Sequence, residues 1–164
     1  MYDIEEIYNT YAKRIYKYIY SLCRDEVLSE DIVQETFLVA SENIDKFKGE
    51  SKIYVWLCSI AKYIWYRKIR KDKKISKLSI DEITNTISAY DLVDEKILEN
   101  EEKIYMYKKI QTLDEETRNI MYLRILGNLT YDEISEITGK SVNYIRVKFF
   151  RGKEKIIKEK KDYE

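Results

Sequence analysis

The sequence contains no histidine, no proline, only four glycines and only two cysteines among its 164 residues. Without histidine, the chain lacks the side chain that most often serves as a general acid–base group and as a metal ligand. Cys23 and Cys58 lie far apart and form no Cys-x-x-Cys motif, which argues against the usual zinc sites and against a disulfide framework. The glycines form no phosphate-binding loop. We therefore expect no catalytic residue, no metal ion, no cofactor and no enzymatic activity.

Long apolar runs are also missing. The longest run without a charge, Ile53 to Ala61, has nine residues, whereas a helix that spans a bilayer needs about 20. The chain does not open with a signal peptide, and two unmatched cysteines are typical of a reducing compartment. These features predict a cytoplasmic protein without membrane insertion.

Charge is abundant and is sorted into blocks of one sign, although the formal net charge is zero. Residues 25–50 carry eight acids and two bases, and residues 81–102 carry eight acids and one base. Residues 62–77 carry eight bases and one acid, and residues 140–161 carry nine bases and two acids. Both basic blocks contain aromatic residues, a combination that suits phosphates and bases together. Solvated helix faces are the alternative interpretation.

Apolar residues recur every three or four positions over most of the chain, which predicts an all-α fold. In the first half we expect helices from about Asp3 to Cys23, from an N-cap at Ser29 to Asn43, and from a cap at Ser51 to Lys71. In the second half, Asp114 is expected to cap a helix that Gly127 ends. The periodicity weakens between the two halves. We expect two small helical domains, residues 1–72 and 101–164, joined by a flexible acidic linker at 73–100.

Residues 131–150 fit a helix-turn-helix motif. Thr130-x-x-Glu133 is a capping box for the first helix, Gly139 occupies the tight turn, and Ser141 caps the second helix. The outward side of the second helix is expected to contact bases and phosphates of DNA. This surface comprises Ser141, Asn143, Tyr144, Arg146, Val147, Lys148 and Arg151. A helical hairpin within a bundle is the alternative interpretation.

Two groups of motifs resemble bacterial RNA polymerase sigma factors. Asp31-Ile-Val-Gln34-Glu35-Thr-Phe37-Leu, Phe47-Lys-Gly49-Glu-Ser51 and Trp56-Leu57-x-x-Ile60-Ala61 look like the second sigma domain. Leu113-Asp-Glu-Glu-Thr-Arg118, Leu123-Arg124 and Leu129-Thr-Tyr-Asp-Glu133-Ile134 look like the fourth. Nothing matches the first or third domain, and this is the layout of the extracytoplasmic-function (ECF) subfamily.

The resemblance implies a protein that binds the clamp coiled coil and the flap of core RNA polymerase and directs the enzyme to promoter DNA. The helix with the Asp-x-x-Gln-Glu motif would dock on the clamp through Asp31, Gln34, Glu35 and Leu38. The helix-turn-helix would recognise the upstream (minus thirty-five) promoter element. Members of the family are often held inactive by an anti-sigma factor, which is a further expected partner.

The resemblance also implies that the first domain opens the downstream (minus ten) element and traps an extruded base of the nontemplate strand. The residues at the matching positions are Phe47, Lys48, Ser51, Lys62, Tyr63, Arg67, Arg70 and Lys71. Structural roles are the alternatives for Asp31 as a helix cap and for Phe37 and Trp56 as core residues. Gly152 stands where the family often has alanine, and glycine inside a helix costs ~1 kcal/mol, so we expect it to weaken the last helix.

Two other classes of protein would share some of these features. A dimeric helix-turn-helix regulator would bind a palindromic duplex without polymerase, its first half serving for dimerisation or ligand binding. A pure protein-interaction module would show no salt-dependent affinity for DNA. The motifs of both halves, in this order, favour the sigma factor.

Overall fold

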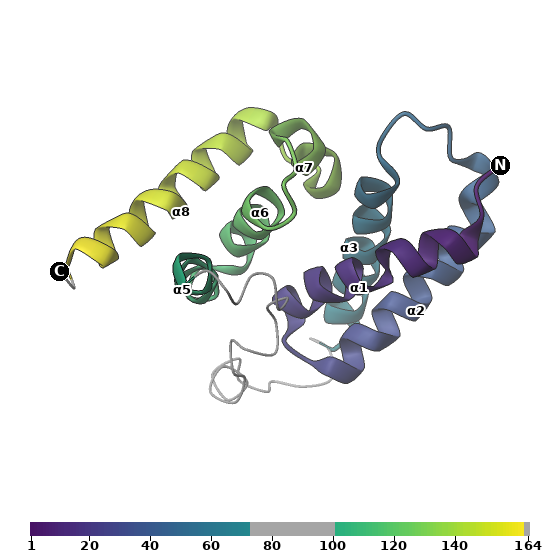
Figure 1. The fold of residues 1–164 in the computed structure, drawn as a ribbon, viewed down its shortest axis with the longest axis horizontal. Coiled ribbons are helices and arrows are strands. Elements are labelled where there is room, and N and C mark those ends of the chain that lie inside the picture. The colour runs from purple at the N-terminus through teal and green to yellow at the C-terminus, as the bar shows by residue number, and fades with distance from the viewer. Residues whose placement is uncertain (73–100, 163–164) are drawn as a thin grey trace. The chain divides into compact units, whose positions relative to one another are not determined.

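The computed structural model describes residues 1–72 and 101–162, and these residues form helices and no strands, as predicted (Figure 1). The elements are α1 (Ile4–Cys23), α2 (Glu26–Asn43), a short 3₁₀ turn η1 (Ile44–Lys46), α3 (Ile53–Asp72), α5 (Glu101–Ile110), α6 (Glu115–Ile125), α7 (Tyr131–Thr138) and α8 (Val142–Asp162). The expected acidic linker lies outside the described residues. None of the helices in the described ranges is long and apolar enough to cross a bilayer.

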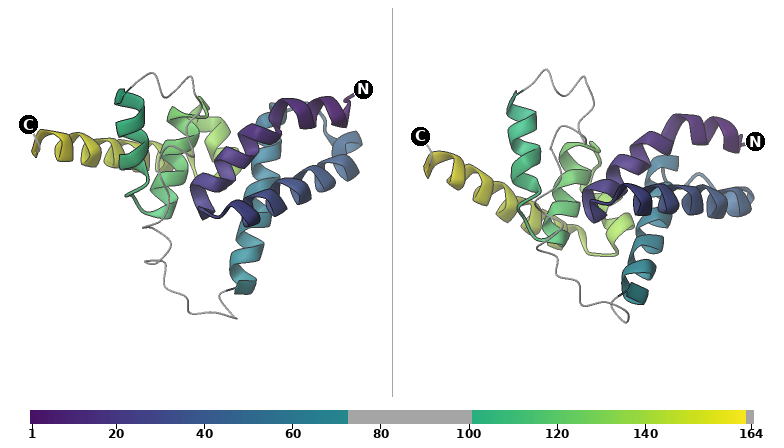
Figure 2. Two further views of the ribbon diagram at one scale, coloured as in Figure 1. Left: turned by 60° about the horizontal axis from the view of Figure 1, so that its bottom comes forward. Right: turned by 90° about the horizontal axis from the view of Figure 1, so that it is seen from below.

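The chain divides into two compact units. In the N-terminal unit, α1 and α2 lie side by side in opposite directions, and α3 packs against both of them (Figure 2). The apolar stripes of the three helices meet in one core, whose largest fully buried side chains are Ile15, Tyr18, Ile19, Ile32, Leu57 and Ile64. Cys58 lies in the same core, and burial raises the pKa of its thiol to about 12. At neutral pH this cysteine is therefore a packing residue and not a nucleophile.

The start of α2 differs from the prediction, because Asp25 and not Ser29 is its N-cap. The Asp25 carboxylate accepts a hydrogen bond from the Leu28 backbone N–H at 2.9 Å. Ser29 is fully buried one turn into the helix, where its hydroxyl donates to the Asp25 carbonyl at 2.6 Å and lies 3.1 Å from Cys23 Sγ. A charged cap one turn earlier lets α2 begin close behind α1, which ends at the left-handed residue Arg24.

The third helix also begins later than Ser51. Its first residue is Ile53, and the Lys52 carbonyl accepts from the Trp56 N–H at 3.1 Å. Ser51 therefore belongs to the loop that precedes the helix. The left-handed turn in this loop is made by Gly49, whose φ is 72°.

The C-terminal unit places α6, α7 and α8 around a second core, and α5 packs on α6 and α8. Its predicted caps are confirmed at three helix starts. Asp114 accepts from the Thr117 N–H, Thr130 accepts from the Glu133 N–H, and Ser141 Oγ accepts from the Tyr144 N–H at 3.1 Å. Gly139 ends α7 with φ at 72° and donates its N–H to the Ser135 carbonyl at 2.8 Å, as the helix-turn-helix requires.

Gly127 ends α6, but the left-handed residue is its neighbour Asn128, with φ at 52°. Glycine is needed at 127 for space, because a Cβ there would lie 2.7 Å from the Leu123 carbonyl oxygen. The helix therefore ends at Gly127 as predicted, but the glycine is required by the lack of space and not by a left-handed backbone conformation.

Gly152 does not break or end α8, which continues to Asp162. Gly152 is buried where α8 crosses α6, and a Cβ there would lie 2.8 Å from Thr117 Cγ2 and 3.2 Å from Met121 Sδ. The Thr117 methyl has little freedom to move, because the hydroxyl of the same side chain donates to the Asp114 carboxylate at 2.7 Å. The glycine thus permits the close contact of the two helices.

We expect Gly152→Ala to lower the free energy of unfolding of the C-terminal unit by about 1 kcal/mol, because overpacking by ~1–3 kcal/mol outweighs a gain of ~1 kcal/mol in helix propensity. Thr117→Ser removes the obstructing methyl and keeps the hydroxyl that bonds Asp114. The double variant Gly152→Ala with Thr117→Ser is therefore expected to be more stable than the sum of the two single effects. Urea unfolding of the full chain measures this coupling, and a stabilising Gly152→Ala single variant would contradict it.

Candidate nucleic-acid interface

The outward side of α8 has the arrangement that was predicted for a recognition helix. Ile145 is fully buried and fixes the orientation of the helix against the rest of the unit. Lys148 is half-buried, and the other predicted members of the surface are exposed: Ser141, Asn143, Tyr144, Arg146, Val147 and Arg151. Their exposure leaves this side available to a partner.

A carboxylate from α6 reaches this surface. The Tyr144 hydroxyl donates to Glu116 Oε2 at 2.7 Å, and Lys148 Nζ lies 3.4 Å from the same oxygen. The hydrogen bond to Glu116 raises the pKa of the Tyr144 phenol. Desolvation acts to lower the pKa of Lys148, but attraction to the Tyr144 phenol and to Glu116 outweighs it, so this pKa is also raised. Sequence spacing alone gave no signal for this contact, because Glu116 lies on another helix.

A tyrosine at the start of α7 gathers two arginines. The guanidinium of Arg124 lies 4.4 Å from the Tyr131 ring centroid, and that of Arg146 lies 5.6 Å from it. Arg124 also donates to the Leu129 carbonyl at 2.9 Å, whereas Arg146 keeps an exposed side chain. The ring therefore positions a cation beside the half of α8 that is predicted to contact bases.

In the N-terminal unit, the loop before α3 borders a cavity of about 540 Å³. Its lining comprises Val39, Asn43, Lys46, Phe47, Lys48, Glu50, Ser51, Trp56 and Ile60. Phe47 stacks on Trp56 with ring centroids 4.8 Å apart and planes inclined by 30°. Tyr2, which sequence reasoning missed, contacts Phe47 edge-on at 5.4 Å. Trp56 is half-buried, so it is neither a full core residue nor a free platform.

Cationic and aromatic side chains continue along α3. Tyr63 is 67% exposed, and Arg67, Arg70 and Lys71 are exposed as well. Lys62 differs from the prediction, because it is only 8% exposed and its ammonium lies 5.0 Å from the Tyr66 ring centroid. Lys62 is buried because it lies on α3 between the core residues Ala61 and Ile64, so it does not belong to the exposed cationic surface.

One side of α2 presents a mixed polar and apolar stripe to solvent. Asp31 and Gln34 are exposed, Leu38 is 61% exposed, and Val27, which the motif did not indicate, is 70% exposed. These four residues lie on one face of the helix, since they follow a spacing of three or four positions. Phe37 is buried against Tyr8, with ring centroids 4.9 Å apart, so its alternative role as a core residue is confirmed.

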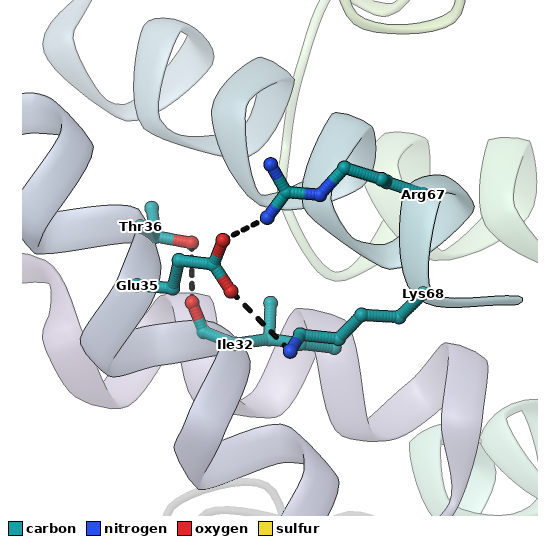
Figure 3. A network of polar contacts seen from close by, with 5 residues as sticks. All are labelled: Ile32, Glu35, Thr36, Arg67 and Lys68. Carbon is teal, nitrogen blue, oxygen red and sulfur yellow. Dashed lines mark hydrogen bonds and ion pairs between the residues drawn. The ribbon is translucent and has the colours of Figure 1, made fainter. Parts of the chain in front are cut away.

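Glu35, the remaining member of the predicted α2 surface, turns toward α3 (Figure 3). Its carboxylate bonds the Arg67 guanidinium and lies 3.3 Å from Lys68 Nζ. The predicted polymerase-binding and DNA-binding surfaces therefore meet at an ion-pair network. Ion pairs this exposed contribute only about 0.2–1 kcal/mol each, so both partners are free to exchange them for other contacts.

Two family models match the chain. Sigma-70 region 2 matches residues 7–75, and Sigma-70, region 4 matches residues 103–156. The first match contains most of α1 and all of α2 and α3, and the second contains most of the C-terminal unit, including the helix-turn-helix.

Several curated proteins are similar in sequence over most of the chain. The ECF RNA polymerase sigma-E factor of Haemophilus influenzae is 30% identical over 134 residues, which cover 77% of this chain and 71% of the relative. The ECF RNA polymerase sigma factor SigM of Bacillus subtilis is 29% identical and covers 93% and 92% of the two chains. The RNA polymerase sigma factor YlaC of the same organism is 25% identical and covers 92% and 88%.

Solved structures share the fold. The sigma factor RpoE of Bartonella quintana, solved in complex with the anti-sigma factor NepR, superposes with a TM-score of 0.69 at 19% identity and covers 93% of this chain and 92% of its own. CnrH, solved in complex with the cytosolic domain of CnrY, superposes with a TM-score of 0.59 at 18% identity. The match covers 93% of this chain and 84% of CnrH. The two family models and the curated relatives point to the same family as the motifs of both units. The chain belongs to the ECF family of RNA polymerase sigma factors.

Proposed function

We propose that this sigma factor, which directs promoter-specific initiation by RNA polymerase, divides its work among three surfaces. The α2 stripe binds core polymerase, the α3 face with the Phe47–Trp56 cavity binds and opens the downstream element, and α8 recognises the upstream element. Residues 1–72 and 101–164 are the two domains that hold these surfaces, and residues 73–100 connect them. The observation that carries the proposal is the exposure of most of the predicted contact residues or their placement at a cavity, whereas Glu35 and Lys148 are half-buried and Lys62 is buried.

The α2 stripe suits a protein partner better than DNA. Asp31 is acidic and exposed, and like charge repels a phosphate backbone. Leu38 and Val27 leave apolar area in water that a partner protein would bury. Glu35 adds a carboxylate that is still partly exposed beside its two cations. A surface of this kind fits a basic helical partner such as the clamp coiled coil.

The cavity suits a flipped base. Extruding a base costs a few kcal/mol, which stacking and backbone contacts must offset. The Phe47–Trp56 pair supplies aromatic faces at the cavity wall, and Lys46 and Lys48 place cations at the same cavity. Tyr63, Arg67, Arg70 and Lys71 extend the cationic surface along α3 for the rest of the strand.

The recognition helix joins a base-contacting half to a phosphate-contacting half. Asn143, Tyr144 and Arg146 lie in its first turns, and Arg151 lies in the basic part. Polymerase fixes the spacing of the two domains, so their modest separate affinities combine on one promoter.

We further infer that the chain catalyses no reaction itself and acts in the cytoplasm, where core polymerase supplies the chemistry. An anti-sigma factor is a proposed second partner. Support comes from the structurally similar sigma factor RpoE, which was solved with the anti-sigma factor NepR.

For the α2 surface we expect Asp31→Asn and Leu38→Ala each to weaken binding to core polymerase by about fivefold, the effect of removing a contact of about 1 kcal/mol. Glu30→Gln is the matched control, because Glu30 is an exposed acid that points about 100° away from Asp31 around α2. Binding of the labelled full chain to core polymerase, followed by fluorescence anisotropy, measures the three affinities. Equal affinities for Asp31→Asn and Glu30→Gln would remove the proposed role of the stripe.

For the cavity we expect Phe47→Ala to reduce the fraction of opened promoter by about tenfold, since base–aromatic stacking is worth about 1–3 kcal/mol. Tyr8→Ala is the control, because it removes a partly exposed ring that contacts Phe37 in the same unit and does not line the cavity, and so it also loses an aromatic contact. Permanganate reactivity of thymines in a promoter complex with the reconstituted holoenzyme reports opening. Unchanged opening in Phe47→Ala would exclude the cavity as the base site.

A further inference from the structure

Glu116 brings an acidic side chain onto a surface that otherwise presents basic and neutral groups to DNA. It lies in the first turn of α6 and its Oε2 contacts both Tyr144 and Lys148, which are one turn apart on α8. Lys140 and Lys148 also place their ammonium groups 5.5 Å and 5.7 Å from the Tyr144 ring centroid. The carboxylate therefore holds together a small cluster at the N-terminal half of the recognition helix.

The contact changes what each side chain can offer to DNA. The single proton of the Tyr144 hydroxyl is donated to Glu116, so the oxygen is left as an acceptor, which suits the amino groups of adenine and cytosine. Lys148 has three donors and one lies on Glu116, so it can still reach a guanine edge or a phosphate. Its charge, however, is already partly neutralised within the protein.

We propose that Glu116 is a specificity-determining residue of the upstream-element interface, which holds Tyr144 and Lys148 in one base-directed arrangement and withholds Lys148 from indiscriminate phosphate binding. The proposal rests on the proposed role of α8. On random-sequence DNA, Lys148 would have to exchange one anionic partner for another, and little is gained. On the correct element, both side chains contact base edges without leaving Glu116.

The counterion balance follows from this arrangement. A lysine that binds a phosphate releases a condensed counterion and steepens the dependence of log K on log salt concentration by about 0.9. Lys148 held by Glu116 contributes little to this slope, whereas Lys148 freed from it contributes fully. Glu116→Gln is therefore expected to steepen the slope on random-sequence duplex DNA by about one, and to raise affinity there about three- to tenfold.

Glu115→Gln is the matched control, because Glu115 is the exposed neighbouring acid in the same first turn of α6. Both variants remove one negative charge and one acidic group at the helix N-terminus. Glu115→Gln should raise affinity for promoter and random DNA equally and leave their ratio unchanged. Glu116→Gln should lower the ratio about tenfold.

The first experiment is run-off transcription by the reconstituted holoenzyme on a promoter selected from a fragment library, with random-sequence duplex as competitor. The Glu116→Gln holoenzyme should lose its transcript at about one tenth of the competitor concentration that the Glu115→Gln holoenzyme needs. Equal sensitivity of the two variants would overturn the proposal. Tyr144→Phe, which removes the hydroxyl that Glu116 accepts from, should shift the sensitivity in the same direction as Glu116→Gln.

The second experiment is a double-mutant cycle with Lys148→Ala in the full chain on random-sequence duplex DNA. Lys148→Ala should cancel the gain of Glu116→Gln and leave the gain of Glu115→Gln intact. Additive effects of Glu116→Gln and Lys148→Ala would overturn the proposal. If neither Lys148→Ala nor Arg151→Ala reduces promoter-directed transcription, the role of α8 itself fails, which is a result distinct from equal behaviour of the two glutamate variants.

Discussion

The surface of the C-terminal unit that we propose to face DNA depends on the burial of one apolar stripe of α8. Ile145 and Ile156 are almost fully buried at its two ends, and Phe149 packs on the core between them. Because a helix has a fixed repeat, fixing this stripe also fixes which side chains point outward. The close crossing at Gly152 sets how near α8 lies to α6, and hence whether Glu116 on α6 can reach Tyr144 and Lys148.

The two units share an electrostatic device. In each, a cation expected at DNA has an acidic partner on a neighbouring helix: Arg67 pairs with Glu35, which also lies beside Lys68, and Lys148 pairs with Glu116. These pairs are partly exposed, so a phosphate that takes the place of the carboxylate exchanges one weak ion pair for another and gains little. A chain with zero net charge can in this way keep strongly basic surfaces without binding every DNA it meets.

Local signals predicted the fold well, because helix caps and apolar spacing act within a few residues. Asp114, Thr130, Gly139 and Ser141 all have the predicted capping or turn roles. Asp25 and Ser29 are both suitable N-caps for α2, and residue spacing alone does not distinguish them. In the structure α2 follows α1 directly, and the earlier residue, Asp25, is the cap. Gly152 differs, since the contact with Thr117 that requires a glycine there involves another helix and leaves no local signal.

The candidate site was predictable to the extent that it lies on single helices. The outward face of α8 follows from the repeat, whereas the contacts of Glu116, the burial of Lys62 and the edge-on contact of Tyr2 with Phe47 depend on distant positions. Such contacts leave no local pattern in one sequence. In the proposed account, these contacts between distant positions determine which cations are available to bind a nucleic acid.

Run-off transcription with purified, sigma-free core polymerase on a library of promoter fragments tests the central claim most directly. With the wild-type chain, the account predicts specific transcripts that are absent without it and absent with the variant Arg146→Ala, Lys148→Ala. Failure to stimulate any transcript, together with tight binding to a palindromic duplex in the absence of polymerase, would contradict it and identify a dimeric regulator.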